Sequence, residues 1–426
     1  MVKWDLKNKQ ENNKTIPSDW EIVSFADIVE VSGGTTPDTT NTGYWNGDIP
    51  WLTPKDITKN HTMHVAKTGR KITQSGLEHG PRNLHPVGSI LMTSRAPVGI
   101  PVINDIPMAV NQGFIAINCK TTDNHFLYYW IRNNLEYLKS ASNGTTFLEL
   151  SKSTFKILKI SLPKNIEEQK SISKILYDLD ILIENIQKQN KTLDFFLKAV
   201  FKSWFVDFDD QTEFIDSELG DIPKGWEIKT IQDLCSLIQS GGTPGRKEST
   251  FWENGTIDWY KTGELHDNFL LKSEERITEL GLKKSSSNLW PENTILFAIY
   301  AFPVVGRLGI LTRPSCSNQA CAGLIAKDSI GTNFLFFSFI FSRSVLSRIA
   351  TGAAQQNINL TILKNHKIIV PPNSLISKFN KLSISFLEMI KINDVKITDL
   401  KKSRDTLLPK LISGEIRIHK KLENRA

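Results

Sequence analysis

The segment that most resembles a catalytic motif is a glycine-rich run in the second half of the chain. Residues 240–247 read Ser-Gly-Gly-Thr-Pro-Gly-Arg-Lys, and loops of this composition can hold phosphate groups with backbone amides. The spacing is wrong for that chemistry, because Arg246 stands where the second glycine belongs and Glu248 follows the lysine. A similar run at residues 32–38 has no lysine. We therefore interpret both runs as glycine-rich turns.

Other residue types that commonly carry catalysis lack the spacing that catalysis requires. The four cysteines form no Cys-x-x-Cys pair, and the histidines are not spaced for zinc. Cys316 and Cys321 are more simply interpreted as buried thiols than as metal ligands or a disulfide. No dinucleotide fingerprint, nucleophile elbow or acidic nuclease cluster is present. The sequence thus favours a binding protein with no catalytic residue, metal or cofactor site of its own.

Composition sets broader limits on the class of protein. A chain of 426 residues with 40% hydrophobic and 23% charged residues is typical of a globular protein with two to four domains. The net charge of +7 and the pI near 9.0 are compatible with a polyanionic partner, but a solvated basic surface would give the same values. No secretory signal or membrane-spanning run is evident, so we expect a cytoplasmic protein.

The strongest pattern in the sequence is an internal repeat. Motifs in the first half return in the second half in the same order and at nearly constant offset, which indicates a tandem duplication. The matching segments are residues 16–22 with 222–228, 32–35 with 240–243, 44–51 with 251–259, and Asn111-Gln112 with Asn318-Gln319.

The first part of each repeat predicts a mixed α/β domain. It is rich in glycine, proline and threonine between short apolar runs, and the runs at 89–93 and 294–298 are typical of buried strands. Residues 123–138 carry the periodicity of a helix instead. The predicted fold class is α/β (α+β), with two tandem domains separated by long helices.

The second part of each repeat predicts one long helix. Residues 166–205 contain no glycine or proline, and their apolar positions alternate in steps of three and four, as in a coiled coil. At 1.5 Å per residue this helix would be about 60 Å long. Residues 375–408 keep the same rhythm with more polar positions. The predicted seam consists of Ile172, Ile175, Leu179, Leu182, Ile186 and Leu193 in the first helix and Phe379, Leu382, Phe386, Met389 and Leu400 in the second.

An apolar stripe of this length needs a partner along its whole length. Each helix packed only on its own domain is one alternative, and an antiparallel coiled coil between the two helices is the favoured one. The predicted boundaries are an N-terminal tail at 1–15, a first α/β domain at 16–163, a long-helix spacer at 164–215, a second α/β domain at 216–371, a second long-helix spacer at 372–416 and a basic tail at 417–426.

Three strings give the chain a resemblance to a known family. They are Phe-Lys-Ser-Trp-Phe-Val-Asp-Phe-Asp at 201–209, Gly-Asp-Ile-Pro-Lys-Gly-Trp-Glu at 220–227 and Thr-Leu-Leu-Pro-Lys-Leu-Ile-Ser-Gly-Glu-Ile at 406–416. In these strings, and in its repeat along nearly the whole chain, the sequence resembles the specificity subunits of type I restriction-modification systems.

The resemblance implies two target-recognition domains, each of which reads one half of a split site in double-stranded DNA. It also implies that the paired helices act as a spacer and bind two modification subunits, and that restriction subunits join the complex. S-adenosylmethionine, ATP and Mg would then be bound by those partner subunits and not by this chain. No membrane partner is implied.

Within this resemblance, residues that can contact base edges or phosphates are candidate DNA contacts. We expect Arg95 to read a base, and Arg70 and Lys71 to contact phosphates, although a solvated surface role remains open for each. The other candidates are Lys55, Gly144, Thr145 and Thr146 in the first domain and Lys261, Tyr300, Arg307, Gln355, Gln356 and Asn357 in the second. Since duplex bases are already stacked, we interpret Trp45, Trp51, Trp252 and Trp259 as core residues.

Two other classes of protein remain open from the sequence. A duplicated scaffold that binds only proteins would explain the repeat and the helices, but not the basic charge or the family strings. A complete methyltransferase would bind the methyl donor without a partner. Salt-dependent binding of the assembled complex to duplex DNA tests the first alternative, and donor binding by the isolated chain tests the second.

Overall fold

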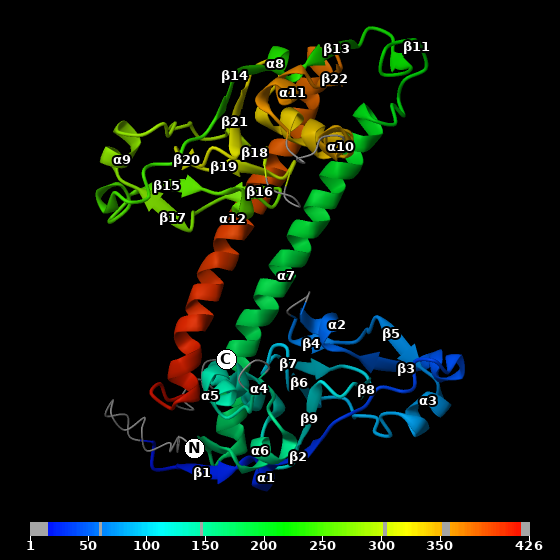
Figure 1. The fold of residues 1–426 in the computed structure, drawn as a ribbon, viewed down its shortest axis with the longest axis vertical. Coiled ribbons are helices and arrows are strands. Elements are labelled where there is room, and N and C mark those ends of the chain that lie inside the picture. Colours follow the sequence, from blue (N-terminus) through cyan, green and yellow to red (C-terminus); the bar gives the residue numbers. More distant parts are fainter. Residues whose placement is uncertain (1–15, 59–61, 145–147, 301–304, 352–357, 419–426) are drawn as a thin grey trace, which may run out of the picture. The chain divides into compact units, whose positions relative to one another are not determined.

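The structure, a computed structural model, describes residues 16–58, 62–144, 148–300, 305–351 and 358–418. The chain forms two compact units: unit 1 is Met1–Glu184 with Asp399–Ala426, and unit 2 is Asn185–Thr398. Each unit therefore combines one α/β domain with parts of both long helices, α7 (Ile166–Phe205) and α12 (Asn373–Ile412) (Figure 1).

Unit 1 contains a five-stranded sheet, a three-stranded sheet and a two-stranded ribbon. The five-stranded sheet has the order β2 (Val29–Ser32), β9 (Phe114–Cys119), β6 (Ile90–Thr93), β7 (Pro101–Asn104) and β4 (His64–Val65), and only the β4–β7 pair is parallel. The three-stranded sheet has the order β5 (Arg70–Ile72), β3 (Trp45–Leu52) and β8 (Ala109–Val110). The ribbon pairs β1 (Trp20–Ser24) with β10 (Lys159–Pro163).

The helices of the first domain cover these sheets. They are α1 (Phe25–Ile28), η2 (Thr42–Tyr44), α2 (Pro54–Thr58), α3 (Gln74–His79), α4 (Asn124–Asn133), α5 (Leu135–Ser140) and α6 (Lys152–Ile157). Helix α4 starts where Asp123 accepts a hydrogen bond from the Phe126 amide at 2.7 Å, an N-cap arrangement. Its apolar residues are buried between the five-stranded sheet and α7 (Figure 1).

Unit 2 repeats the same strand orders, so the duplication found in the sequence is also a duplication of fold. Its five-stranded sheet runs β14 (Cys235–Ser240), β21 (Cys321–Ala326), β18 (Ile295–Ala298), β19 (Leu308–Leu311) and β16 (Asn268–Leu270). Its three-stranded sheet runs β17 (Glu275–Ile277), β15 (Ile257–Tyr260) and β20 (Cys316–Ser317). Two ribbons pair β13 (Glu227–Thr230) with β22 (Lys367–Val370) and β11 (Phe214–Ile215) with β12 (Ile222–Pro223). The helices are α8 (Ile231–Leu234), η3 (Ser249–Phe251), η4 (Thr262–Glu264), α9 (Glu279–Lys283), α10 (Thr332–Thr351) and α11 (Leu360–Asn365).

The two long helices pack against each other in an antiparallel manner within each unit. In unit 2, Asn190 donates to Asp394 at 2.9 Å, and further along α7 the Phe196 ring lies 5.0 Å from that of Phe386. In unit 1, Arg404 pairs with Asp180 at 2.6 Å. Residue numbers on α12 fall as those on α7 rise, which defines the antiparallel direction.

The seam of this helix pair differs in part from the predicted one. Ile172 and Phe379 are buried, and Leu179, Ile186, Leu193, Leu382, Phe386 and Leu400 are half-buried. The prediction is wrong for three residues, because Ile175, Leu182 and Met389 are 37%, 46% and 45% exposed.

The physical reason for this difference is that α7 must contact its neighbouring α/β domains as well as α12. Its buried positions advance in steps of four, as in Ile172–Leu176–Asp180 and in Leu197–Phe201–Phe205. The two clusters to which the apolar members of these sets belong consist mostly of α/β domain residues. A strict heptad repeat does not describe a face that is shared in this way.

A buried ionic cluster joins the first domain to both long helices in unit 1. The Asp180 carboxylate accepts hydrogen bonds from Tyr129 at 2.8 Å, from Arg132 at 3.3 Å and from Arg404 at 2.6 Å. Burial and the adjacent Asp180 raise the pKa of Tyr129, so its hydroxyl stays protonated and able to donate. The cluster specifies which residue of α12 lies beside α4 and α7.

We expect the substitution Arg404→Ala to destabilise unit 1 by about 2–3 kcal/mol, because it leaves a buried carboxylate without its closest cation. Arg132 and Tyr129 still contact Asp180, which keeps the loss below that of a fully unpaired charge. Urea denaturation followed by circular dichroism measures the change, with Lys401→Ala on the exposed face of α12 as the matched control. Equal midpoints for the two variants would show that the cluster does not stabilise the unit.

Candidate nucleic-acid interface

The five-stranded sheet of the first domain collects several loops at one edge. Strands β2 and β6 end there and strands β9 and β7 begin there, because these neighbours are antiparallel. We call the described residues at this place, 33–37, 94–100, 111–113, 142–144 and 148–150, the first loop edge. Hydrogen bonds tie its loops together: the Ser94 amide donates to the Gly113 carbonyl at 2.8 Å, and the Leu150 amide donates to the Ser94 carbonyl at 2.9 Å.

The first loop edge brings two of the predicted DNA contacts together. Arg95 and Asn143 both form bridges with Glu149, so Arg95 lies beside the loop that contains Gly144. The guanidinium of Arg95 is 4.0 Å from the Glu149 carboxylate and remains partly exposed. Gly144 has a φ of +106°, a conformation that favours glycine. Thr145 and Thr146 lie outside the described residues.

The second domain forms an equivalent second loop edge, whose described residues are 241–244, 299–300, 305–307, 318–320 and Ile358. The Ile299 amide donates to the Ala320 carbonyl at 2.9 Å, and the Ile358 amide donates to the Ile299 carbonyl at 3.0 Å. Tyr300, which directly follows Ile299 and is 39% exposed, therefore lies at this edge. Arg307 contacts the His266 ring at 3.3 Å. Gln355, Gln356 and Asn357 lie outside the described residues.

The glycine-rich runs are turns that pack backbone against backbone. A Cβ atom on Gly34 would lie 1.6 Å from the Val110 carbonyl oxygen, and one on Gly242 would lie 2.2 Å from the Ser286 carbonyl oxygen. These contacts require glycine whether or not a ligand is present. They support the interpretation of both runs as turns and not as nucleotide-binding loops.

An arginine lies over a tryptophan pair in each domain. The Arg70 guanidinium stands 3.5 Å from the centre of the Trp45 ring, and Arg246 stands 3.9 Å from that of Trp252. Trp45, Trp51 and Trp259 are buried, as predicted for core residues, whereas Trp252 is half-buried. Stacking of this kind orients a guanidinium. Lys55 and Lys71, two further predicted contacts in the first domain, are exposed.

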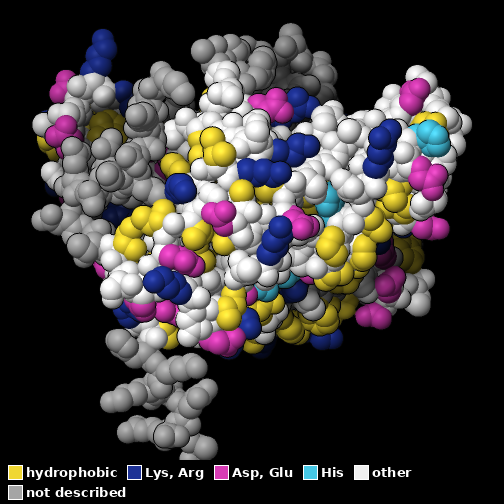
Figure 2. All heavy atoms as spheres, turned by 90° about the horizontal axis from the view of Figure 1, so that it is seen from below, with side chains coloured by type: hydrophobic (Ala, Val, Ile, Leu, Met, Phe, Trp, Pro, Cys, Tyr) yellow, Lys and Arg dark blue, Asp and Glu magenta, His cyan; other side chains and the backbone are white. Residues whose placement is uncertain are grey.

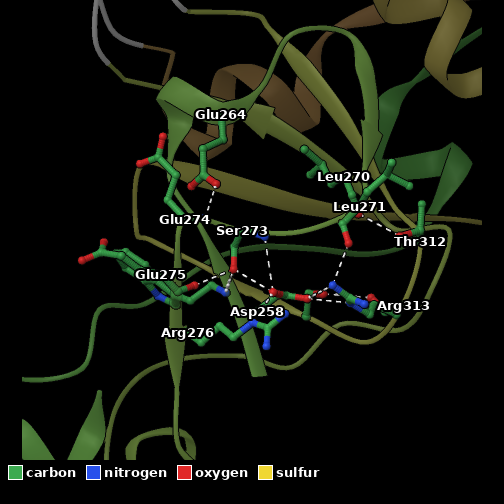
Figure 3. Close-up of polar contacts among 12 residues, drawn as sticks. Asp258, Glu264, Leu270, Leu271, Ser273, Glu274, Glu275, Arg276, Thr312 and Arg313 are labelled. Carbon is green, nitrogen blue, oxygen red and sulfur yellow. Dashed lines mark hydrogen bonds and ion pairs between the residues drawn. The ribbon is translucent and has the colours of Figure 1, made fainter. Parts of the chain in front are cut away.

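In the second domain, several basic side chains are paired with acidic ones. Asp258 accepts hydrogen bonds from Ser273 at 2.8 Å, Arg276 at 3.0 Å and Arg313 at 2.5 Å (Figure 3). Burial disfavours the charged form of Asp258, but these hydrogen bonds outweigh it and lower the pKa of the carboxyl group. The predicted contact Lys261 is likewise paired, with Glu274 at 2.8 Å and Glu275 at 3.4 Å. Much of the positive charge beside β15 and β17 is thus offset within the domain.

Charge alone does not outline an interface on the face of the molecule that Figure 2 shows. Lys and Arg side chains are interspersed there with acidic and apolar side chains and form no single basic patch. Over the described ranges, no group of three or more His, Cys, Asp or Glu is placed to hold a metal ion. The four cysteines are free thiols, and burial raises the pKa of Cys235 and Cys316 to about 12. The loop edges, with their exposed polar side chains, remain the candidate interface.

The sequence analysis missed one feature of both edges, a hydrogen bond between two side chains. Thr36 donates to Gln112 at 2.6 Å in the first domain, and Thr243 donates to Gln319 in the second. The Asn-Gln pair was visible as a repeat, but its partner lies 76 residues earlier in each domain.

Comparison with known proteins agrees with this duplicated architecture. A family model described as the type I restriction modification DNA specificity domain matches residues 17–194 and 223–395, once in each half of the chain. The chain belongs to this family of specificity subunits. Its two α/β domains are accordingly DNA specificity domains.

Relatives match over two thirds or more of this specificity subunit. It is 35% identical to the type I restriction enzyme MjaIX specificity subunit of Methanocaldococcus jannaschii, over 98% of this chain and 99% of that protein. It is 25% identical to the HindI specificity subunit of Haemophilus influenzae, over 68% of this chain and 77% of that protein. The S subunit of a type I system from M. genitalium has the same fold, with a TM-score of 0.62 at 16% identity over 96% of this chain and 98% of that one.

Proposed function

We propose that this specificity subunit reads an asymmetric, two-part site in double-stranded DNA, with one loop edge for each part. The observation that carries the proposal is that the two five-stranded sheets have corresponding loop edges that expose different side chains. Arg95 stands after β6 in the first domain, and Tyr300 stands near the end of β18 in the second. Two domains that share a fold but expose different side chains are suited to two different DNA sequences.

Different side chains would contact different parts of the DNA. Arg95 is suited to guanine, because a guanidinium can donate two hydrogen bonds to one base edge. Arg70, which lies over the Trp45 ring, and the exposed Lys55 and Lys71 are suited to phosphates. Lys261 is the weakest of the proposed contacts because Glu274 and Glu275 already offset its charge.

The long helices would bind the modification subunits. Both helices expose large apolar side chains, and an apolar surface of this kind favours a protein partner. These residues are Leu182, Phe195, Ile384, Ile392 and Val395, which are 46%, 74%, 55%, 51% and 44% exposed. Because the helix is present in two copies, we propose two modification subunits per chain, which restriction subunits then join.

In this proposal the chain itself neither methylates nor cleaves DNA. The modification and restriction subunits would bind S-adenosylmethionine, ATP and Mg and supply the chemistry, while this chain selects the site. Among the described residues, no helix is long and apolar enough to cross a membrane. The complex would act in the cytoplasm, the compartment expected from the sequence.

The experiment that tests the proposal is DNA binding by the chain assembled with its modification subunits. We expect the affinity for duplex DNA to fall as salt rises, with a slope of about −0.9 in log affinity per log salt for each phosphate contacted. The assembled complex should also prefer one two-part sequence over unrelated duplexes. A complex that assembles normally but binds no duplex DNA at low salt would favour a scaffold that binds only proteins.

A further inference from the structure

The hydrogen bond between threonine and glutamine at each loop edge is built in the same way in both domains. In the first domain the Thr36 hydroxyl donates to Oε1 of Gln112 at 2.6 Å. In the second domain the Thr243 hydroxyl donates to Oε1 of Gln319. The two residues of each pair are 76 positions apart along the chain. The same contact thus exists twice, in corresponding places.

This contact is kept although the turns around it differ in length. The first turn has two threonines before its proline and the second has one, and in both the residue that donates is the threonine directly before the proline, Pro37 or Pro244. The glutamine is exposed and the threonine half-buried in both domains. Because this surface contact is present in both domains although the turns differ in length, similarity of the neighbouring sequence alone does not explain it.

The hydrogen bond leaves each glutamine with a defined free group. Its Oε1 atom already accepts from the threonine hydroxyl, so Nε2, which carries two N–H donors, is the part of the carboxamide left for a ligand. Within the described part of the chain, no protein group accepts a hydrogen bond from Nε2 of Gln112 or Gln319. A ligand that suits this group must offer hydrogen-bond acceptors, and the oxygens of a phosphate do so.

Gln112 and Gln319 lie beside the residues proposed to read bases. The carbonyl of Gly113, directly after Gln112, accepts the Ser94 amide at 2.8 Å, and Arg95 follows Ser94. The carbonyl of Ala320, directly after Gln319, accepts the Ile299 amide at 2.9 Å, and Tyr300 follows Ile299. Each glutamine is therefore close to the proposed base-reading residue of its own domain, and that residue differs between the two domains.

From this arrangement we propose that Gln112 and Gln319 each bind one phosphate of the DNA backbone through Nε2, independently of base sequence. The inference rests on the proposed function and assigns phosphate binding and base recognition to different residues of each loop edge. Residues that differ between the two edges can distinguish two base sequences, whereas a residue that is the same at both edges suits the part of DNA that is the same in both, its phosphates. Thr36 and Thr243 are positioning residues, because they hold the carboxamide with its donors directed to the ligand.

The substitution Gln112→Ala tests this proposal in the assembled complex. We expect at least about tenfold weaker binding to duplexes that carry the recognised site and to unrelated duplexes alike, as for one lost hydrogen bond to a charged group. The preference for the site, which is the ratio of the two affinities, should stay unchanged. Gln319→Ala should act in the same way, and Gln74→Ala, an exposed glutamine on α3, should change neither affinity.

A phosphate-specific probe makes the test direct. A set of duplexes would each carry one uncharged methylphosphonate, at successive positions of the site. At one position per half-site we expect the methylphosphonate to weaken binding by the wild-type complex. At that same position it should not weaken binding by the matching alanine variant any further, because the contact is already lost. Gln112→Lys should retain binding on every duplex and steepen the salt dependence by about 0.9. Thr36→Val should weaken binding as Gln112→Ala does, and Thr36→Ser should not.

Three outcomes would overturn the proposal. An altered base preference in one half-site for Gln112→Ala would make this residue a base reader. Unchanged affinity on all duplexes, with the wild-type complex still binding its site, would show that Gln112 contacts no DNA and would leave the proposed function intact. Failure of the wild-type complex to bind any duplex would remove the proposed function together with this inference.

Discussion

The substitution Leu176→Asp is expected to lower the free energy of unfolding of unit 1 by about 5 kcal/mol or more. Leu176 on α7 is fully buried among residues of the first domain and the end of α12. Loss of a buried leucine side chain alone costs roughly 2–5 kcal/mol, and an uncompensated carboxylate in an apolar cluster adds to that cost. Since the whole stability of a domain is about 5–15 kcal/mol, much of unit 1 should be unfolded at physiological temperature.

Ile175 supplies the matched control for this prediction. It precedes Leu176 on the same helix and is 37% exposed, so Ile175→Asp is expected to cost no more than about 1 kcal/mol. Calorimetry of the two variants measures the difference. The transition of unit 1 should fall by roughly 10–20 °C in Leu176→Asp, as expected for a loss of this size in a unit of about 200 residues. Equal losses in both variants would mean that the heptad seam drawn from the sequence describes the helix better than the structure does.

This pair of residues also shows how far the sequence predicts the fold. The first long helix was predicted over the residues that α7 occupies, because 40 residues without glycine or proline leave few alternatives. The buried face of the helix was predicted less well. A heptad pattern assumes one partner helix, whereas α7 is buried against α12 and also against the α/β domains, and the second contact moves the buried positions from Ile175 to Leu176.

The candidate site shows the same limit. Arg95 and Gly144 were proposed separately, and strand pairing brings their loops together through Glu149. The contact between Thr36 and Gln112 could not be predicted from the repeated glycine-rich run and Asn-Gln pair alone, because it depends on β2 and β9 meeting side by side. Contacts within one loop follow from local sequence, whereas contacts across a sheet require the strand order.

The second large effect concerns the DNA sequence that the complex recognises. We expect two short specified blocks separated by an unspecified gap, because two domains with separate loop edges read separate stretches of duplex. The blocks should differ from each other, because Arg95 and Tyr300 present different groups at corresponding places. Sequencing of methylated positions in cells that carry the complete system reports both blocks at once.

The substitution Arg95→Ala should relax the first block and leave the second one unchanged. A guanidinium that donates two hydrogen bonds to one base contributes about 1–3 kcal/mol to discrimination against the wrong base, which corresponds to roughly a 5- to 150-fold change in preference at one position. Lys120→Ala, an exposed position after the end of β9 that lies opposite the loop edge, serves as the control and should leave both blocks unchanged. Loss of specificity in both blocks after Arg95→Ala would show that the domains do not read DNA independently. A single uninterrupted or palindromic methylated sequence in the wild type would contradict the two-reader arrangement itself, since two different loop edges cannot be expected to select the same half-site.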